Sequence, residues 1–353
     1  MRKILRLSFI LLPALGGLIV LYLLFIPKNY EVAPFKKRYG TQYWTLATGS
    51  TIGFTKIEAE GPTPQPPILY LHGGPGGGAS DQTIEVLRPL AQEGYPLYFY
   101  DQIGGGHSPR LDNIEDYTVQ RHLADLEVII EQIQAPKVIL LGHSWGAILA
   151  TLYTADHPEQ IDRLLLTGPG PLAPIRWELA AQQAPDSLDL RPPAITNQQA
   201  GQRVQSLRSR LVDRWAFSFG KKLADDGEAD AFAAYLFSEL NKSAVRDAAL
   251  LPEARIGIGY YAHIMTFKSF AAVADRRAQL RQSEVPILLM RGQYDNQKWG
   301  FAQEYLELFS NHRLAIIPDA GHFIEWEQPE VYLQIIRDFL LEKDEEHPRS
   351  DDG

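Results

Sequence analysis

Short apolar runs alternate with longer stretches of helical spacing along most of the 353-residue chain, and this alternation restricts the fold more than any other feature. Strands that alternate with helices form βαβ units, which build a parallel sheet with helices on its faces. Two β-rich runs, Gln42–Ala47 and Ile52–Ala59, are expected to open the same sheet with antiparallel strands. The runs predicted as parallel strands are Ile68–Leu71, Leu97–Tyr100, Val138–Leu141, Leu164–Thr167, Ile287–Met290 and Leu314–Ile317.

The alternation stops in the middle of the chain, where helical patterns continue without strand signals between two Pro-containing joints. We therefore expect residues 171–283 to form a helical cap inserted into a core made of residues 39–170 and 284–343. Ligands of open α/β sheets bind at the carboxyl ends of the strands, so the cap is expected to cover that edge. Residues 344–353 are mostly charged or small, which is typical of a disordered tail.

The N-terminal region is predicted to be a membrane anchor. Leu7–Ile26 contains no charged residue, and twenty residues at about 1.5 Å each span roughly 30 Å, the thickness of a bilayer core. A cleaved signal peptide has small residues at its cleavage site, and none follow this run. We expect residues 1–38 to form an uncleaved single-pass anchor and linker, with residues 7–26 in the membrane. The bases Arg2, Lys3 and Arg6 favour a catalytic domain outside the cytoplasm, although bases also follow the run.

Composition excludes several function classes. The formal net charge is −9, and bases outnumber acids in residues 1–38, so the rest of the chain is strongly acidic and disfavours nucleic acid as a partner. The chain has no cysteine, which removes disulfides, thiolate metal sites and a cysteine nucleophile. We find no pattern for a metal and no pattern for a cofactor.

One motif predicts a nucleophile. Gly142-His143-Ser144-Trp145-Gly146 follows the predicted strand Val138–Leu141 and opens a helical pattern. A Gly-x-Ser-x-Gly at a strand-to-helix turn is the nucleophile elbow of the α/β-hydrolase fold, in which the tight turn needs small neighbours. The sequence therefore predicts this fold, with Ser144 as the nucleophile.

A serine hydroxyl needs a base, and the base needs a third group that fixes its tautomer. Asp295 follows the predicted strand at 287–290, and His322 follows the last predicted strand. The order Ser, Asp, His is that of the α/β-hydrolases. Asp319 is the competing carboxylate, but it lies on the histidine's own loop. Ser144, Asp295 and His322 are thus the predicted catalytic residues.

A glycine-rich loop, His72-Gly73-Gly74-Pro75-Gly76-Gly77-Gly78, follows the first predicted parallel strand. It lacks the Gly-Lys-Ser/Thr ending of phosphate-binding loops and the Gly-x-Gly-x-x-Gly pattern of dinucleotide-binding loops. Bare backbone at this place can direct an N–H group at the oxyanion that forms during acyl transfer, together with the N–H of the residue after the nucleophile. The predicted oxyanion donors are Gly74, or Gly73, and Trp145.

Three motifs resemble the proline iminopeptidase family of α/β-hydrolases. They are His72-Gly73-Gly74-Pro75-Gly76, Asp101-Gln102-x-Gly104-x-Gly106-x-Ser108 and Gly142-x-Ser144-Trp145-Gly146. The resemblance covers about residues 40–170 and 284–342. It implies an aminopeptidase that releases an N-terminal residue, often proline, from small peptides, with the triad and oxyanion donors given above.

The chain departs from the family pattern at Ile103, where the family usually has Arg, and at His143, where it often has Gly. The family binds the substrate's free amine through cap carboxylates. Glu178 and Glu239 are the candidates here, and Gly73 is a further candidate for substrate contact.

Two alternatives to the aminopeptidase use the same residues. One is a membrane-anchored esterase, lipase or amidase that acts on an acyl ester with the same triad. The other is a non-catalytic binding module, which the complete set of catalytic parts disfavours. Proline arylamides and short aryl esters distinguish the first alternative from the peptidase.

Overall fold

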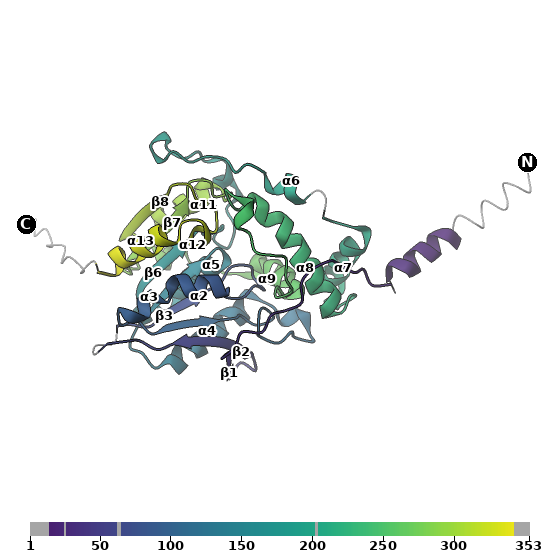
Figure 1. Cartoon of the computed structure of the whole chain (residues 1–353), viewed down its shortest axis with the longest axis horizontal. Coiled ribbons are helices and arrows are strands. Elements are labelled where there is room, and N and C mark those ends of the chain that lie inside the picture. Colours follow the sequence, from purple (N-terminus) through teal and green to yellow (C-terminus); the bar gives the residue numbers. More distant parts are fainter. Residues whose placement is uncertain (1–13, 25, 62–64, 202–203, 342–353) are drawn as a thin grey trace, which may run out of the picture.

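The computed structural model describes residues 14–24, 26–61, 65–201 and 204–341. Within these residues, one sheet has the strand order β1-β2-β4-β3-β5-β6-β7-β8 (Figure 1). Neighbours from β4 through β8 are parallel, whereas β2 is antiparallel to both β1 and β4. The predicted α/β fold, with a mostly parallel sheet and an antiparallel opening, is therefore confirmed. The strands are β1 Gln42–Thr45, β2 Thr51–Ile57, β3 Ile68–Leu71, β4 Leu97–Tyr100, β5 Val138–His143, β6 Ile161–Thr167, β7 Ile287–Gly292 and β8 His312–Ile317.

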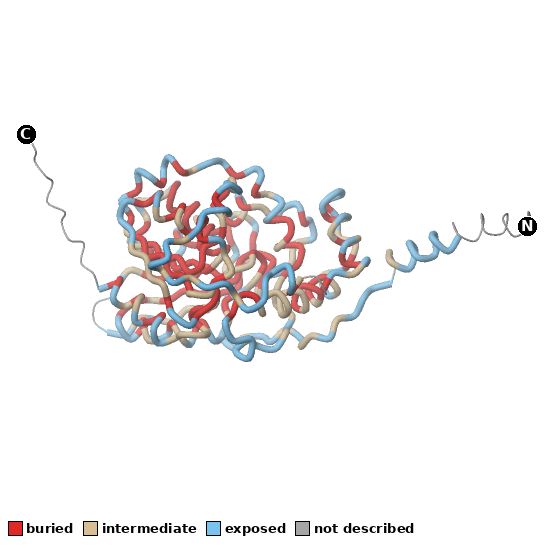
Figure 2. Tube along the Cα trace, turned by 90° about the horizontal axis from the view of Figure 1, so that it is seen from above, coloured by how far each residue is buried: buried red, intermediate tan, exposed pale blue. Residues whose placement is uncertain are grey.

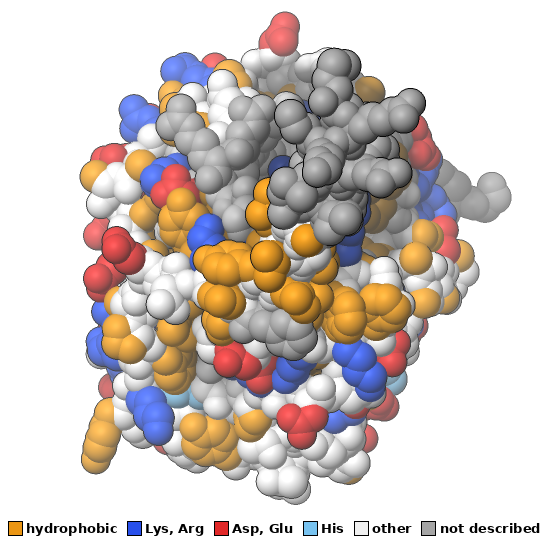
Figure 3. All heavy atoms as spheres, turned by 90° about the vertical axis from the view of Figure 1, so that its right-hand side faces the viewer, with side chains coloured by type: hydrophobic (Ala, Val, Ile, Leu, Met, Phe, Trp, Pro, Cys, Tyr) orange, Lys and Arg blue, Asp and Glu red, His pale blue; other side chains and the backbone are white. Residues whose placement is uncertain are grey.

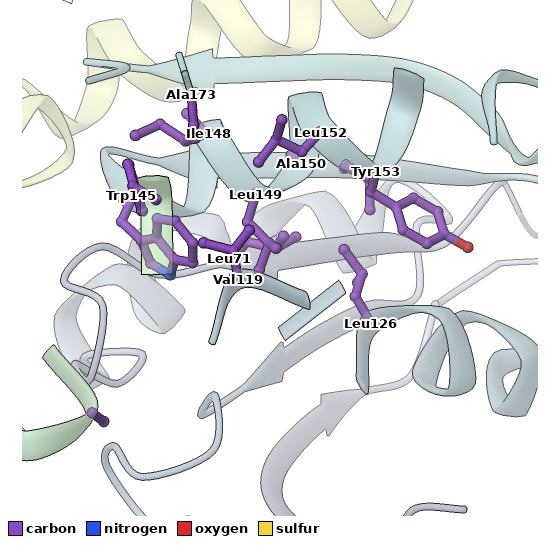
Figure 4. Close-up of a cluster of buried hydrophobic side chains, with 14 of the residues drawn as sticks. Leu71, Val119, Leu126, Trp145, Ile148, Leu149, Ala150, Leu152, Tyr153 and Ala173 are labelled. Carbon is purple, nitrogen blue, oxygen red and sulfur yellow. The ribbon is translucent and has the colours of Figure 1, made fainter. Parts of the chain in front are cut away.

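The two faces of the sheet pack against different helices. Side chains alternate between the faces along a strand, so Leu69 and Leu71 of β3 join one buried cluster while Ile68 and Tyr70 join the other. Figure 4 shows part of the first cluster, with Leu149 of α5 among its members. Helices that contribute to the first cluster include α4 Val119–Ile133, α5 Trp145–Asp156 and α11 Trp299–Leu308. Those of the second are α2 Asp81–Leu87, α3 Pro89–Gln92, α12 Ile324–Glu327 and α13 Pro329–Leu341.

The segment between β6 and β7 consists of helices and turns. Ser206 begins α7 with a capping box, and Asp225 caps α8. The elements are η3 Trp177–Ala181, η4 Asp186–Leu188, α6 Asn197–Gly201, α7 Leu207–Phe219, α8 Asp226–Leu240, η5 Asn241–Ser243, η6 Ala248–Leu250, α9 Tyr260–Ser269, η7 Phe270–Ala272 and α10 Arg277–Leu280. Short 3-10 turns also occur at η1 Ile114–Asp116 and η2 Pro158–Gln160.

The predicted membrane anchor is not supported, and the membrane localisation derived from it is wrong. Within the part of the chain that the structure describes, no helix is both long and apolar enough to cross a bilayer. The helix over residues 14–24, the first coil in Figure 1, covers only about half of a hydrocarbon core at 1.5 Å per residue. Residues 7–13 of the predicted span lie outside the described residues, as does the predicted tail at 344–353.

Residues after this helix pack against the inserted helices, although a loose linker was expected there. The Tyr30 ring lies 5.3 Å from the Phe232 ring and 5.8 Å from the Tyr235 ring of α8. The Lys28 backbone N–H donates to Glu228 over 3.0 Å. Figure 2 shows the exposed N-terminal helix leading into this packed stretch. Figure 3 looks onto the right-hand side of Figure 1, where hydrophobic side chains gather on the surface. The exposed large hydrophobic residues of the chain include Phe217 and Phe219 of α7.

Candidate active site

Ser144 occupies a strained turn between β5 and α5. Its φ of 54° and ψ of −114° are rare for a residue with a side chain, and such strain concentrates at functional sites. A Cβ at Gly142 would lie 2.5 Å from the Gly146 carbonyl oxygen, and one at Gly146 would lie 1.9 Å from the Leu71 carbonyl oxygen. Glycine is therefore required on both sides of the turn. Ser144 is half-buried, while its neighbours His143 and Trp145 are buried.

Asp295 and His322 form a buried pair on the loops that follow β7 and β8. His322 Nδ1 donates to Asp295 Oδ1 over 3.0 Å, and the Gln297 backbone N–H donates to the same oxygen over 3.0 Å. Burial alone would raise the pKa of Asp295, but His322, Arg291 and the Gln297 N–H together hold the pKa well below its usual value. The carboxylate thus stays ionised and leaves the second ring nitrogen of His322 free as an acceptor.

The structure brings the elbow and the charge pair into one cluster. His143, beside Ser144, directs its Nε2 to the His322 carbonyl oxygen over 3.1 Å, and the two rings lie 4.8 Å apart. Among the described residues, Ser144 Oγ makes no hydrogen bond, so the serine–histidine contact is not closed in this conformation. Such contacts are often long without substrate and shorten when it binds.

His143 and Gly168 belong to this cluster, and the sequence reasoning missed both. Burial, with the neighbouring His322 ring, lowers the pKa of His143 to about 3, so His143 stays neutral and donates its Nε2–H. Gly168 has a φ of +50°, and a Cβ there would lie 2.8 Å from His322 Nδ1 and 3.1 Å from Asp295 Oδ2. The sequence showed Gly168 only as part of a Gly-Pro joint after a strand.

The glycine-rich loop is held over the amino end of α5 by the Asp101-Gln102 motif. Asp101 accepts the Ala79 N–H over 2.8 Å, and the Gln102 side chain accepts the Trp145 indole N–H over 2.7 Å. The Gln102 backbone N–H donates to His72 Nε2 over 2.9 Å. Burial lowers the pKa of His72, which keeps this ring neutral. These contacts fix the loop that carries Gly73 and Gly74 relative to the residue after the nucleophile.

Comparison with known proteins assigns the chain to a family. Residues 66–329 match the sequence model of the family described as "alpha/beta hydrolase fold". The chain belongs to this family. It is 26% identical to a proline iminopeptidase of Heyndrickxia coagulans, over 85% of this chain and 98% of the relative. A proline iminopeptidase of Saccharolobus solfataricus is 27% identical, over 77% of this chain and 84% of that relative. The resemblance to this group is confirmed, and the chain is a hydrolase.

A solved structure agrees with the fold. The esterase EaEST from Exiguobacterium antarcticum superposes with a TM-score of 0.55 at 18% identity, covering 85% of this chain and 98% of the esterase. At this identity the likeness supports the fold of the hydrolase and says nothing about its substrate.

The two predicted amine-binding carboxylates are already engaged. Glu178 is exposed and pairs with Arg176 over 3.0 Å. Glu239 pairs with Lys242 over 2.7 Å. Within the described ranges, neither carboxylate has a hydrogen bond or ion pair with Ser144, Asp295 or His322, and their role in amine binding stays a prediction. Among the described residues of the hydrolase, no group of His, Cys, Asp and Glu side chains has the arrangement of a metal site.

A cavity of about 500 Å³ lies next to the glycine-rich loop of the hydrolase. Its walls come from residues 35–38, residues 78–82, the end of α8 and residues 251–258, with Trp326 near the histidine loop. None of Ser144, Asp295 and His322 is among its lining residues. Part of the N-terminal segment that was expected to be a linker forms one wall of this cavity.

Proposed function

We propose that the hydrolase is a serine aminopeptidase that releases proline or another small residue from the N-terminus of short peptides. The observation that supports this best is the buried His322–Asp295 pair, with its 3.0 Å bond, in one cluster with the strained Ser144. The proline iminopeptidase relatives, which align along most of the chain, support the substrate class.

In the proposed reaction Ser144 Oγ attacks the carbonyl carbon of the first residue while His322 takes the hydroxyl proton. The oxyanion accepts hydrogen bonds from the backbone N–H groups of Trp145 and of Gly74 or Gly73. His322 then gives its proton to the leaving amine, and water hydrolyses the acyl-enzyme by the same steps. Asp295 stays ionised throughout and stabilises the imidazolium.

The proposal gives residues 171–283 the role of a cap over the core formed by residues 39–170 and 284–343. Aromatic rings extend from the elbow into this segment. Trp145 lies 5.4 Å from Phe270, Phe270 lies 5.1 Å from Phe267, and Phe267 lies 5.0 Å from His263. His263 faces the glycine-rich loop, 3.1 Å from the Pro75 carbonyl oxygen. These rings meet at interplanar angles of 37°, 44° and 78°, so the row is a packed aromatic connection between the elbow and the inserted segment.

One observation favours a second candidate. Glu178 and Glu239 each form an ion pair with a neighbouring base, and neither has a hydrogen bond or ion pair with Ser144, Asp295 or His322 among the described residues. An esterase or amidase that needs no free amine would use the same triad.

The test uses the full chain with proline arylamides and short aryl acyl esters. The proposal expects kcat/KM to favour the arylamide with a free amine over its N-acetylated form. A kcat/KM that favours the esters, and that N-acetylation leaves unchanged, would select the esterase. For either substrate, Ser144→Ala is expected to lower kcat by at least about 10³-fold, as triad knockouts do. Retained activity in this variant would exclude Ser144 as the nucleophile.

A further inference from the structure

The loop that carries His322 is joined to the inserted segment between η5 and η6. We call residues 244–247 the bridging segment. The His322 backbone N–H donates to the Ala244 carbonyl oxygen over 2.6 Å. A Cβ at Gly321 would lie 2.5 Å from that same oxygen and 2.8 Å from Val245 Cα. The histidine loop therefore approaches the bridging segment as closely as two backbones can, and only glycine permits the contact.

Glu327, at the end of α12, joins the two segments with a single carboxylate. Its Oε1 accepts the backbone N–H groups of Arg246 and Asp247 over 2.7 and 3.0 Å. Its Oε2 accepts the Gly321 N–H over 2.6 Å. All three partners are donors, and bonds to an ionised acceptor are among the strongest in proteins. The bond to Gly321 is partly buried, whereas the bonds to Arg246 and Asp247 are exposed to water.

Further side-chain contacts join the same region to the histidine loop through Asp319, and to the aspartate loop through Tyr294 and Asn296. Arg246 pairs with Asp319 over 3.0 Å and lies over the Tyr294 ring at 5.4 Å. The Asn296 amide, next to Asp295, donates to Ser243 Oγ over 3.4 Å. The arginine and Asp319 are each about half exposed, and pairs of this kind contribute little. Glu327 is thus the side chain that joins the bridging segment to the backbone of the histidine loop at Gly321, beside the direct backbone bond from His322 to Ala244.

We propose that Glu327 is a positioning residue for the hydrolase: it fastens the inserted segment to the histidine loop and thereby sets the position of the His322 ring relative to Ser144. This inference rests on the proposed function, in which His322 is the base. A displacement of about 1 Å at a catalytic group costs on the order of 10²-fold in rate.

Glu327→Gln is a sharp test, because the amide has one acceptor oxygen where the carboxylate has two. The variant can keep the bonds to Arg246 and Asp247 or the bond to Gly321, but its NH₂ group faces an N–H at the other end. Glu327→Asp keeps the charge on a shorter side chain and serves as the conservative variant. Glu330→Gln is the matched control, since Glu330 is an exposed acid at the start of α13.

The probe is a fluorophosphonate, which reports on the base without any peptide recognition. Ser144 Oγ bonds to phosphorus, fluoride leaves, and the hydroxyl proton passes to His322. We expect Glu327→Gln to lower the labelling rate at saturation by about 10²-fold, with half-saturation within about two-fold of the wild type. Glu327→Asp should recover about ten-fold of that loss and stay about ten-fold below the wild type, and Glu330→Gln should label like the wild type. Rates are normalised to the folded fraction measured by near-UV circular dichroism.

The outcomes separate the two proposals. A wild-type chain that the probe does not label overturns the serine mechanism and the role of Glu327 with it. A labelled wild type together with Glu327→Gln labelled at the same rate overturns the role of Glu327 alone. If the Gln variant is unfolded, Glu327→Asp decides: an unchanged rate refutes the positioning role, and a reduced rate with unchanged half-saturation supports it.

Discussion

Asp295→Asn tests how much the negative charge of the Asp295 carboxylate contributes to the catalytic rate, separately from its hydrogen bonds. Both donors to Asp295, His322 Nδ1 and the Gln297 N–H, converge on Oδ1 at 3.0 Å. The other oxygen, Oδ2, is buried and has no hydrogen-bond partner among the described residues. An asparagine can therefore place its oxygen at the Oδ1 position and keep both bonds, with its NH₂ group at the Oδ2 position. The histidine keeps its tautomer, and only the negative charge is lost.

The expected magnitude follows from that charge. Two unit charges about 4 Å apart at an effective dielectric constant of about 20 interact by about 4 kcal/mol, which is about 10³-fold in rate. We expect kcat of Asp295→Asn to fall by about 10³-fold, less than the roughly 10⁴-fold loss seen where the same change reverses the histidine tautomer. The assay is kcat on the preferred substrate at neutral pH, with circular dichroism as the folding control. A loss below about ten-fold would refute the role of the charge.

The same variant has a pH signature. Because the folded pKa of Asp295 lies below its unfolded value, its ionisation stabilises the fold above the unfolded pKa, and this stabilisation is lost as the pH falls through the folded pKa. Acid unfolding of Asp295→Asn, followed by circular dichroism, should therefore begin from a lower stability and depend less on pH than that of the wild type. An identical acid transition in both proteins would contradict the direction of this pKa.

Two further predictions concern neighbours of the triad. Gly168→Ala should lower kcat by about 10²-fold, because its Cβ would lie 2.8 Å from His322 Nδ1. Gly170→Ala is the control and should keep wild-type kcat, because its Cβ would meet only the end of the Ile148 side chain at 3.2 Å. Equal kcat values for the two variants would refute this prediction. Burial raises the pKa of Glu325 to about 7, so the stability it contributes is present below its ordinary pKa and is lost as the pH rises through 7. Urea unfolding should show that Glu325→Gln removes up to about 3 kcal/mol of the loss in stability between acidic and mildly basic pH, and an unchanged pH dependence would contradict the buried carboxyl.

Local patterns predicted the sheet and the order of the reactive groups. The parallel strands are short apolar runs bounded by turns, because both faces of a parallel sheet are covered and its strands are therefore apolar on both sides. The nucleophile elbow could be predicted from the sequence because its geometry leaves no room for a Cβ at positions 142 and 146. The ends of the inserted helices were harder to predict from the sequence. Capping by Ser206 and Asp225, rather than the apolar pattern, sets where α7 and α8 begin. The predicted membrane span is not supported: within the described residues no helix is long and apolar enough to cross a bilayer.

The sequence by itself determined that this chain forms a hydrolase sheet with a serine, an aspartate and a histidine at the carboxyl ends of its strands. Those features are local, since each is a strand followed by a turn of restricted composition. Only the tertiary structure decided what surrounds them: the contact of His143 with His322, the close approach of Gly168, and the three bonds that Glu327 makes to two segments about 80 residues apart. Such contacts depend on which backbone groups meet in space, and because any residue offers the same backbone N–H and C=O, they leave little trace in residue type.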